Sequence, residues 1–222
     1  MGLYYEVHGE GPPLLLILGL AGDVSESTRL IDGLAAGHQV IAFDNRGAGR
    51  SGKPDSPYSI EMMASDALGL LDALAVPRAA VLGISLGGRI AMELALGHPD
   101  RVERLILTST SARVVRKPGR GRLWPILSGL PLLRSRHPQP RYAFVRQFEA
   151  STGYDATDRL SQLTMPVLIL HGGHDRVAPL ALAEEMHGRI AGSRLVVFKG
   201  GHLFFVIREP RRFLESVRDF LD

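Results

Sequence analysis

Short apolar runs alternate along the chain with longer segments in which apolar residues recur every three or four positions. The runs are rich in Val, Ile and Leu and predict buried strands, whereas the periodic segments predict helices. The predicted strands are Leu3–Val7, Leu14–Leu18, Val40–Phe43, Ala79–Ile84, Arg104–Thr108, Val167–His171 and Arg194–Phe198. The predicted helices are Ser27–Ala36, Ile60–Ala75, Leu86–Leu96, Ala181–Ile190 and Pro210–Leu221. Because helices lie between continuously apolar strands, the pattern predicts an α/β fold with a mainly parallel central sheet and helices on both faces.

The first two predicted strands are separated only by the turn-forming residues Gly9 to Pro13. Such a short connection, rich in Gly and Pro, between two apolar runs is typical of a β-hairpin. We therefore expect Leu3–Val7 to pair directly with Leu14–Leu18.

One segment, residues 111–158, breaks the alternation and is rich in Arg, Pro and Gly. A structureless stretch of this length inside a compact domain is typical of a lid or a binding insertion. We therefore divide the chain into a core, residues 1–110 and 159–222, and a short lid insertion, residues 111–158. The apolar residues of the lid are candidates to roof a substrate pocket; they are Trp124, Ile126, Leu127, Leu130, Leu132 and Leu133.

The composition excludes several classes of protein. The 222 residues and 45% apolar content are those of one globular domain. The apolar runs are far too short to cross a bilayer, and no basic segment precedes an apolar leader. We therefore expect a cytoplasmic protein without an integral membrane segment. The chain has no cysteine, which excludes disulfides, thiolate metal sites and a cysteine nucleophile.

The basic charge is concentrated in one segment. Ten Lys and Arg residues and no Asp or Glu lie between Arg104 and Arg146, although the formal net charge is only +3. These cations either attract anionic substrates or an anionic membrane surface, or form the solvated outer face of a lid. We expect no nucleic-acid partner.

The most informative motif is Gly83-Ile84-Ser85-Leu86-Gly87, which lies between a predicted strand and a predicted helix. A G-x-S-x-G sequence in this context is typical of a nucleophile elbow, in which small neighbours allow a sharp turn to expose the serine. The turn also places the Leu86 N–H at a helix N-terminus, where it is suited to stabilise an oxyanion. The alternative is a tight turn whose serine caps the helix.

Two later strand ends supply partners for this serine, whose hydroxyl needs a base and an orienting group to become a nucleophile. Asp175 follows the strand Val167–His171, and His202 follows the strand Arg194–Phe198. Parallel strands end at the same edge of a sheet, which is where Ser85 also lies. The order serine, aspartate, histidine is that of α/β-hydrolases.

Other interpretations of these residues stay open. His202 is alternatively an ordinary loop histidine, and Asp175 a turn residue. His171 and His174 could join Asp175 in a metal site, but their positions fit packing better, and we expect no metal.

A second glycine-rich segment, Gly47 to Gly52, matches a dinucleotide-binding fingerprint. That motif requires a helix to start at once, so that its amides face phosphate, yet Pro54 to Pro57 follow. We interpret the segment as a tight loop in which Asp44 and Arg46 satisfy backbone groups, and we expect no cofactor.

Together the motifs resemble the α/β-hydrolase superfamily, in particular its lid-bearing esterases, enol-lactonases and cofactor-free perhydrolases. The resemblance implies that Ser85 is the nucleophile, His202 the general base and acid, and Asp175 the orienting carboxylate. It also implies an oxyanion hole made by the backbone N–H groups of Leu86 and Leu20. The five matching segments are Leu18–Gly22, Asp44–Ser51, Gly83–Gly87, Gly172–Pro179 and Gly201-His202.

The chain departs from this pattern at Leu18-Gly19, where most of these proteins carry His-Gly. Leu3–Val7 also resembles the second strand of the family, which leaves the usual first strand without a counterpart, and the lid is short for this group. The implied function is a serine hydrolase that cleaves small-molecule carboxylic esters, including lactones, of small to medium acyl chain through an acyl-enzyme. The alternatives are a cofactor-free perhydrolase or a C–C bond hydrolase with the same triad, and a non-catalytic binding protein on this fold.

Overall fold

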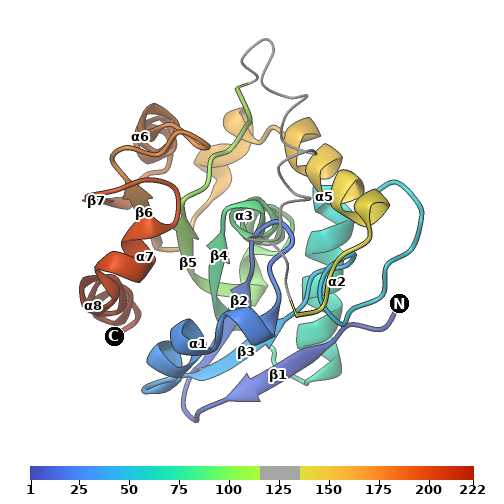
Figure 1. Cartoon of the computed structure of the whole chain (residues 1–222). Coiled ribbons are helices and arrows are strands. Elements are labelled where there is room, and N and C mark those ends of the chain that lie inside the picture. Colours follow the sequence, from blue (N-terminus) through green and yellow to red (C-terminus); the bar gives the residue numbers. More distant parts are fainter. Residues whose placement is uncertain (116–135) are drawn as a thin grey trace.

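A seven-stranded sheet forms the centre of the molecule. The structure is a computed structural model that describes residues 1–115 and 136–222 (Figure 1). The strand order is β1-β3-β2-β4-β5-β6-β7, and every neighbouring pair is parallel except β1 with β3. The predicted α/β fold with a mainly parallel sheet is therefore confirmed. The strands are β1 (Tyr5–His8), β2 (Pro13–Ile17), β3 (Gln39–Phe43), β4 (Ala79–Ile84), β5 (Val102–Thr108), β6 (Val167–Gly172) and β7 (Arg194–Phe198).

Helices cover both faces of the sheet (Figure 1). The α-helices are α1 (Thr28–Ala35), α2 (Ile60–Ala73), α3 (Leu86–Gly97), α5 (Arg141–Gly153), α6 (Leu180–Arg189), α7 (Phe204–Arg208) and α8 (Pro210–Leu221). Short 3-10 helices are η1 (Val24–Glu26), η2 (Pro99–Arg101) and η4 (Thr157–Gln162). Helices α2, α3 and α6 pack on one face, and α1, α7 and α8 on the other. In the ranges described, no helix is long and apolar enough to span a membrane.

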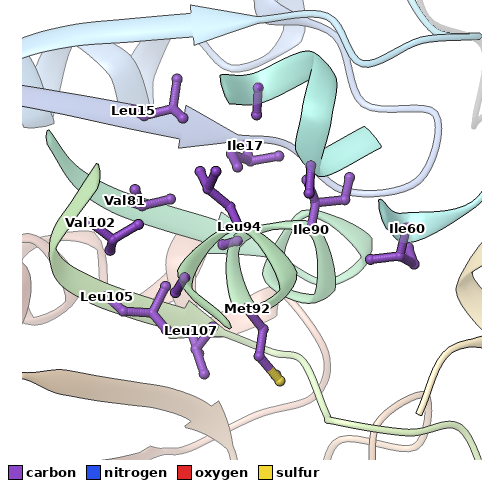
Figure 2. Close-up of a cluster of buried hydrophobic side chains, with 14 of the residues drawn as sticks. Leu15, Ile17, Ile60, Val81, Ile90, Met92, Leu94, Val102, Leu105 and Leu107 are labelled. Atoms are coloured by element: carbon purple, nitrogen blue, oxygen red, sulfur yellow. The ribbon is translucent and has the colours of Figure 1, made fainter. Parts of the chain in front are cut away.

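Burial on both faces explains why the central strands are apolar at every position. In β4 all six residues are buried, with Val81 on the face covered by α3 and Leu82 on the opposite face. Figure 2 shows the first of these two cores, in which side chains of β2, β4 and β5 meet Ile90 and Leu94 of α3. Removing this apolar surface from water is the main stabilising contribution to the fold.

The predicted hairpin between the first two strands is wrong, because β3 lies between β1 and β2. Leu14 to Ile17 of β2 are fully buried and have parallel neighbours on both sides, β3 and β4, which leaves no edge for β1. The connection instead crosses the start of β3. Gly9 and Gly11 adopt positive φ there, and the Gln39 N–H donates to the Pro12 carbonyl.

Helix α5 lies within residues 111–158, where the sequence pattern predicted no regular structure. Its buried positions include the polar residues Gln147 and Ser151, which hide the apolar periodicity of the helix. Its start is tied to the loop before α2, because the Tyr142 hydroxyl donates to the Lys53 carbonyl at 2.7 Å. This part of the chain is therefore not structureless.

The first turn of α3 lies directly against β2. A Cβ atom at Gly87 would overlap the carbonyl oxygens of Ile17 and Leu18, whereas Gly97 at the other end of the same helix has open space around its Cα. The contact is with backbone and cannot be relieved by a rotamer change.

We expect Gly87→Ala to destabilise the protein by at least about 3 kcal/mol, the upper range for overpacking a core. Gly97→Ala should be neutral or stabilising by up to about 1 kcal/mol, because alanine is the better helix former. Urea unfolding of both variants beside the wild type measures the difference. Equal stability of the two variants would contradict the packing described for α3.

Candidate active site

Three strand ends bring Ser85, Asp175 and His202 together at the carboxyl edge of the sheet. Ser85 follows β4, Asp175 lies in the loop after β6, and His202 follows β7. The His202 Nε2 atom lies 2.9 Å from the Ser85 Oγ atom, and His202 Nδ1 lies 2.7 Å from Asp175 Oδ2. The three side chains predicted from the sequence thus form one hydrogen-bonded chain, although Ser85 and His202 are 117 positions apart.

The backbone of Ser85 is strained, with φ 55° and ψ −113°. Non-glycine residues rarely adopt positive φ, and such residues cluster at functional sites. The turn is tight, since a Cβ atom at Gly83 would overlap the Gly87 carbonyl oxygen. The Ser85 N–H donates to the Thr108 carbonyl at 2.9 Å, so the serine is fixed to the neighbouring strand β5.

Asp175 is buried and accepts hydrogen bonds with both oxygens. Its Oδ1 accepts from the N–H groups of Val177 and Ala178 at 2.8 and 2.9 Å, and its Oδ2 faces His202. Burial raises the pKa of Asp175, but the hydrogen bond to His202 and the two backbone donors outweigh it and hold the pKa below its usual value. An ionised Asp175 makes Nδ1 of His202 the donor, which leaves Nε2 as an acceptor for the Ser85 hydroxyl.

His171 supports the loop that carries Asp175. It is fully buried, its Nε2 lies 2.7 Å from the Ala178 carbonyl oxygen, and it lies 3.6 Å from Asp175 Oδ2. Burial lowers the pKa of His171, so the ring is neutral and donates from Nε2. His174, by contrast, is exposed. Within residues 1–115 and 136–222 no cluster of three His, Asp or Glu side chains is arranged to hold a metal ion.

The two amides predicted for the oxyanion hole lie on segments that border Ser85. Leu86 is the first residue of α3, where backbone N–H groups have no partner within the helix. Leu20 lies in the loop after β2, and an ideal Cβ at Gly19 in that loop would lie 3.4 Å from the Ser85 Cβ. The Asn45 side chain donates to the Leu18 carbonyl at 2.8 Å and holds this loop.

Gln147 of α5 was not predicted from the sequence. It is fully buried, its Oε1 accepts from the Ala21 N–H at 3.1 Å, and its Nε2 donates to the Arg46 carbonyl at 2.7 Å. The side chain thereby joins α5 to the loop that carries Leu20. The only signal in the sequence is a polar residue at a position that a helical register would bury.

The candidate substrate-binding residues of the lid lie outside the described residues. They are Trp124, Ile126, Leu127, Leu130, Leu132 and Leu133. Their assignment stays a prediction.

The glycine-rich segment after β3 is a tight loop, and α2 begins only at Ile60. The Asp44 carboxylate accepts from the N–H groups of Val24 and Arg50, each at 2.7 Å, and fills the space beside Gly49. The expectation for Asp44 is confirmed. Arg46 does not do what we expected, because its guanidinium pairs with Asp66 instead.

These features match a known family, and the predicted resemblance is confirmed. Residues 12–129 match the family model for the alpha/beta hydrolase fold, and the chain belongs to this family. The chain is 33% identical, over 98% of its length and 94% of the relative, to RutD of Azorhizobium caulinodans, classed as a carbamate hydrolase.

Solved structures of the family are similar over nearly the whole chain. The enol-lactonase from Burkholderia xenovorans is 28% identical with a TM-score of 0.85, covering 99% of this chain and 96% of its own. The esterase from Exiguobacterium antarcticum is 27% identical with a TM-score of 0.86, covering 98% and 94%. These similarities support hydrolase activity on this fold.

Acid is expected to destabilise the protein through His171. The pKa of its neutral ring lies below that of the unfolded chain, about 6.5, so the unfolded state binds the additional proton. The contribution of the neutral His171 to the free energy of unfolding is therefore fully present above about pH 6.5 and is lost as the pH falls below that value. In His171→Gln, the amide still donates toward Ala178 but does not titrate.

We expect the urea unfolding midpoint of the wild type to fall more steeply between about pH 7 and pH 5 than that of His171→Gln. His174→Gln, which changes an exposed histidine three residues away, should follow the wild type. Parallel pH curves for wild type and His171→Gln would show that His171 does not carry the effect.

Proposed function

We propose that the protein is a serine hydrolase that cleaves carboxylic esters, including lactones, with Ser85 as nucleophile, His202 as general base and acid, and Asp175 as the orienting carboxylate. The observation that supports the proposal most strongly is the continuous hydrogen-bonded chain from the Ser85 hydroxyl through the His202 ring to the Asp175 carboxylate. The strained turn at Ser85 and the similarity to esterases and enol-lactonases support it further.

In the proposed reaction, His202 Nε2 takes the proton of Ser85 Oγ while that oxygen attacks the carbonyl carbon of the ester. The resulting oxyanion accepts hydrogen bonds from the N–H groups of Leu86 and Leu20. The alkoxide then leaves with the proton from His202, and the acyl group stays on Ser85. Water, deprotonated by His202, attacks the acyl-enzyme and releases the acid.

In this scheme the ionised Asp175 carboxylate stabilises the protonated ring of His202. When His202 takes the serine proton, its ring becomes a cation beside the buried carboxylate at 2.7 Å. A short ion pair in a poorly hydrated site is stronger than the same pair in water. Asp175 therefore stabilises the imidazolium that exists only during the reaction.

We assign substrate selection to the lid, residues 111–158, and place Trp124, Ile126, Leu127 and Leu130 at an acyl pocket for small to medium chains. The contact of Gln147 with the loop of Leu20 supports this assignment, because it connects the same insertion to the proposed oxyanion hole. The apolar composition of these residues suits an acyl chain.

A second candidate activity is carbamate hydrolysis, which the similarity to a RutD protein over 98% of the chain favours. A carbamate carbonyl is attacked by the same nucleophile and leaves the same kind of oxyanion. It is less electrophilic than an ester, so the two substrates differ in rate rather than in mechanism.

We expect Ser85→Ala to fold as the wild type does and to lose about a million-fold in turnover, as for other nucleophiles of this kind. The measurement is hydrolysis of p-nitrophenyl esters of increasing chain length, a set of lactones and a p-nitrophenyl carbamate. Activity of Ser85→Ala equal to wild type on any of them would rule out Ser85 as the nucleophile for that substrate. The relative rates on esters and on the carbamate decide between the two candidate activities.

Asp175→Asn should keep the geometry but favour the other tautomer of His202, because the Asn amide can donate to Nδ1. The proton of the neutral ring then lies on Nε2, which can no longer accept the Ser85 proton. We expect a loss of about ten-thousand-fold in kcat, the effect of this change in a comparable triad. Asp32→Asn, which changes an exposed carboxylate outside the lid, serves as the control. Near-normal kcat in Asp175→Asn would show that another group orients His202.

A further inference from the structure

Two hydroxyl side chains after β5 contact the backbones of the proposed nucleophile and base. Thr110 Oγ1 donates to the Ser85 carbonyl at 2.7 Å, and Ser109 Oγ donates to the His202 carbonyl. Both residues are almost fully buried, with exposed fractions of 0% and 1% for Ser109 and Thr110. Neither belongs to the triad or to the proposed oxyanion hole.

The contact of Thr110 acts on the peptide unit that joins Ser85 to Leu86. A peptide is planar, and its C=O and N–H point in opposite directions. Holding the Ser85 carbonyl oxygen therefore holds the Leu86 N–H, the proposed oxyanion donor, in its direction. A hydrogen bond to the carbonyl also polarises the peptide and makes its N–H a stronger donor. The Gly88 N–H donates to the same oxygen at 3.0 Å, so this peptide is held from two sides.

Thr110 is also packed against the turn. An ideal Cβ at Gly88 would lie 2.5 Å from the Thr110 Cγ2 atom and 2.7 Å from its Oγ1 atom. The glycine at this position therefore leaves the space that the threonine side chain occupies. Any larger residue at Gly88 would push the hydroxyl away from the Ser85 carbonyl.

Ser109 holds the base in a corresponding way. Its backbone is fixed to β6, because its N–H donates to the Leu170 carbonyl at 2.9 Å, and it adopts φ 47°. A serine at positive φ is uncommon and persists only where the surrounding structure requires it. Here the conformation coincides with a hydroxyl that contacts the His202 carbonyl.

We propose that Ser109 and Thr110 are positioning residues that hold the backbones of His202 and Ser85 in register, with Thr110 aiming the Leu86 N–H at the oxyanion. Because the two are consecutive, the separation of the base and the nucleophile is set by one peptide unit at the end of β5. This proposal rests on the proposed function, in which Ser85 is the nucleophile.

The test compares Thr110→Val with Thr108→Val. Both changes replace a buried threonine hydroxyl near the end of β5 by a methyl group of similar size, but Thr108 Oγ1 has no hydrogen-bond partner among the described residues. The readouts are kcat and KM for p-nitrophenyl acetate, and the rate at which a fluorophosphonate labels the protein. The phosphonyl oxygen occupies the position of the oxyanion, so the label reports on the hole without knowledge of the natural substrate.

We expect Thr110→Val to lose about 10- to 100-fold in kcat and in labelling rate, less than the loss of a whole oxyanion donor. KM should change by less than about threefold, because the interaction is made in the transition state. Thr108→Val should behave as the wild type. Equal kcat and labelling rates in the two variants would overturn the proposal for Thr110.

Two further variants keep the test valid if Thr110→Val is unstable. Thr110→Ser and Thr110→Ala both lose the methyl contact with Gly88 and differ only in the hydroxyl, so serine should restore most of the rate and alanine should not. Ser109→Ala should lower kcat about tenfold by releasing His202, and an unchanged kcat would overturn its role. If the fluorophosphonate does not label the wild type faster than Ser85→Ala, the proposed function fails. If it labels the wild type faster than Ser85→Ala but labels Thr110→Val as fast as the wild type, only the positioning role of Thr110 fails.

Discussion

The sharp turn at Ser85 is the constraint on which the rest of the site depends. A non-glycine residue at φ 55° is stable only if the surrounding backbone leaves it no alternative. That condition is met by close packing. Gly83 and Gly87 approach each other across the turn, and α3 begins so close to β2 that a side chain at Gly87 does not fit. The strain at the serine is maintained by the core of the fold.

The same packing determines the electrostatics of the site. Four parallel strands end at one edge, and the loops that follow them carry the serine, the aspartate, the histidine and the two hydroxyls of Ser109 and Thr110. Asp175 stays ionised in a buried position because backbone N–H groups and His202 replace the water it has lost. His171 is neutral because burial lowers the pKa of its ring, and this effect outweighs the nearby Ala178 carbonyl and Asp175, which favour the charged form. The ionised carboxylate is the state of Asp175 that the proposed reaction needs.

Much of the fold can be predicted from the sequence, because parallel strands that are buried on both faces consist of uninterrupted runs of apolar residues. Each strand and each long core helix lies within a few residues of its predicted position. The order of the strands in the sheet cannot be predicted in the same way. It depends on which strands pair, and the apolar pattern along the chain carries no information about pairing between distant segments. Thus β1 pairs with β3 and not with its neighbour in sequence. Helix α5 was not predicted because its buried face contains the polar residues Gln147 and Ser151. Gln147 binds the loop after β2, and Ser151 accepts a hydrogen bond from the buried Arg89 of α3.

The candidate site was predictable where a residue type is tied to a position at a strand end, as for Ser85, Asp175 and His202. It was not predictable where a common side chain acts through the backbone of another residue. Ser109 and Thr110 stand in an ordinary polar run after β5, and only the structure shows which carbonyls their hydroxyls contact. Asn45 and Gln147 are of the same kind, since each holds the loop after β2 by a backbone atom.

The most direct measurement of the central claim is to trap the reaction intermediate. Rapid mixing with an activated ester, acid quench and mass spectrometry of the digested protein locate any acyl group on the chain. The account predicts that the acyl group is found on the peptide containing Ser85, and that it forms and decays at least as fast as the enzyme turns over. Steady turnover with no acyl group on that peptide at any time would contradict it.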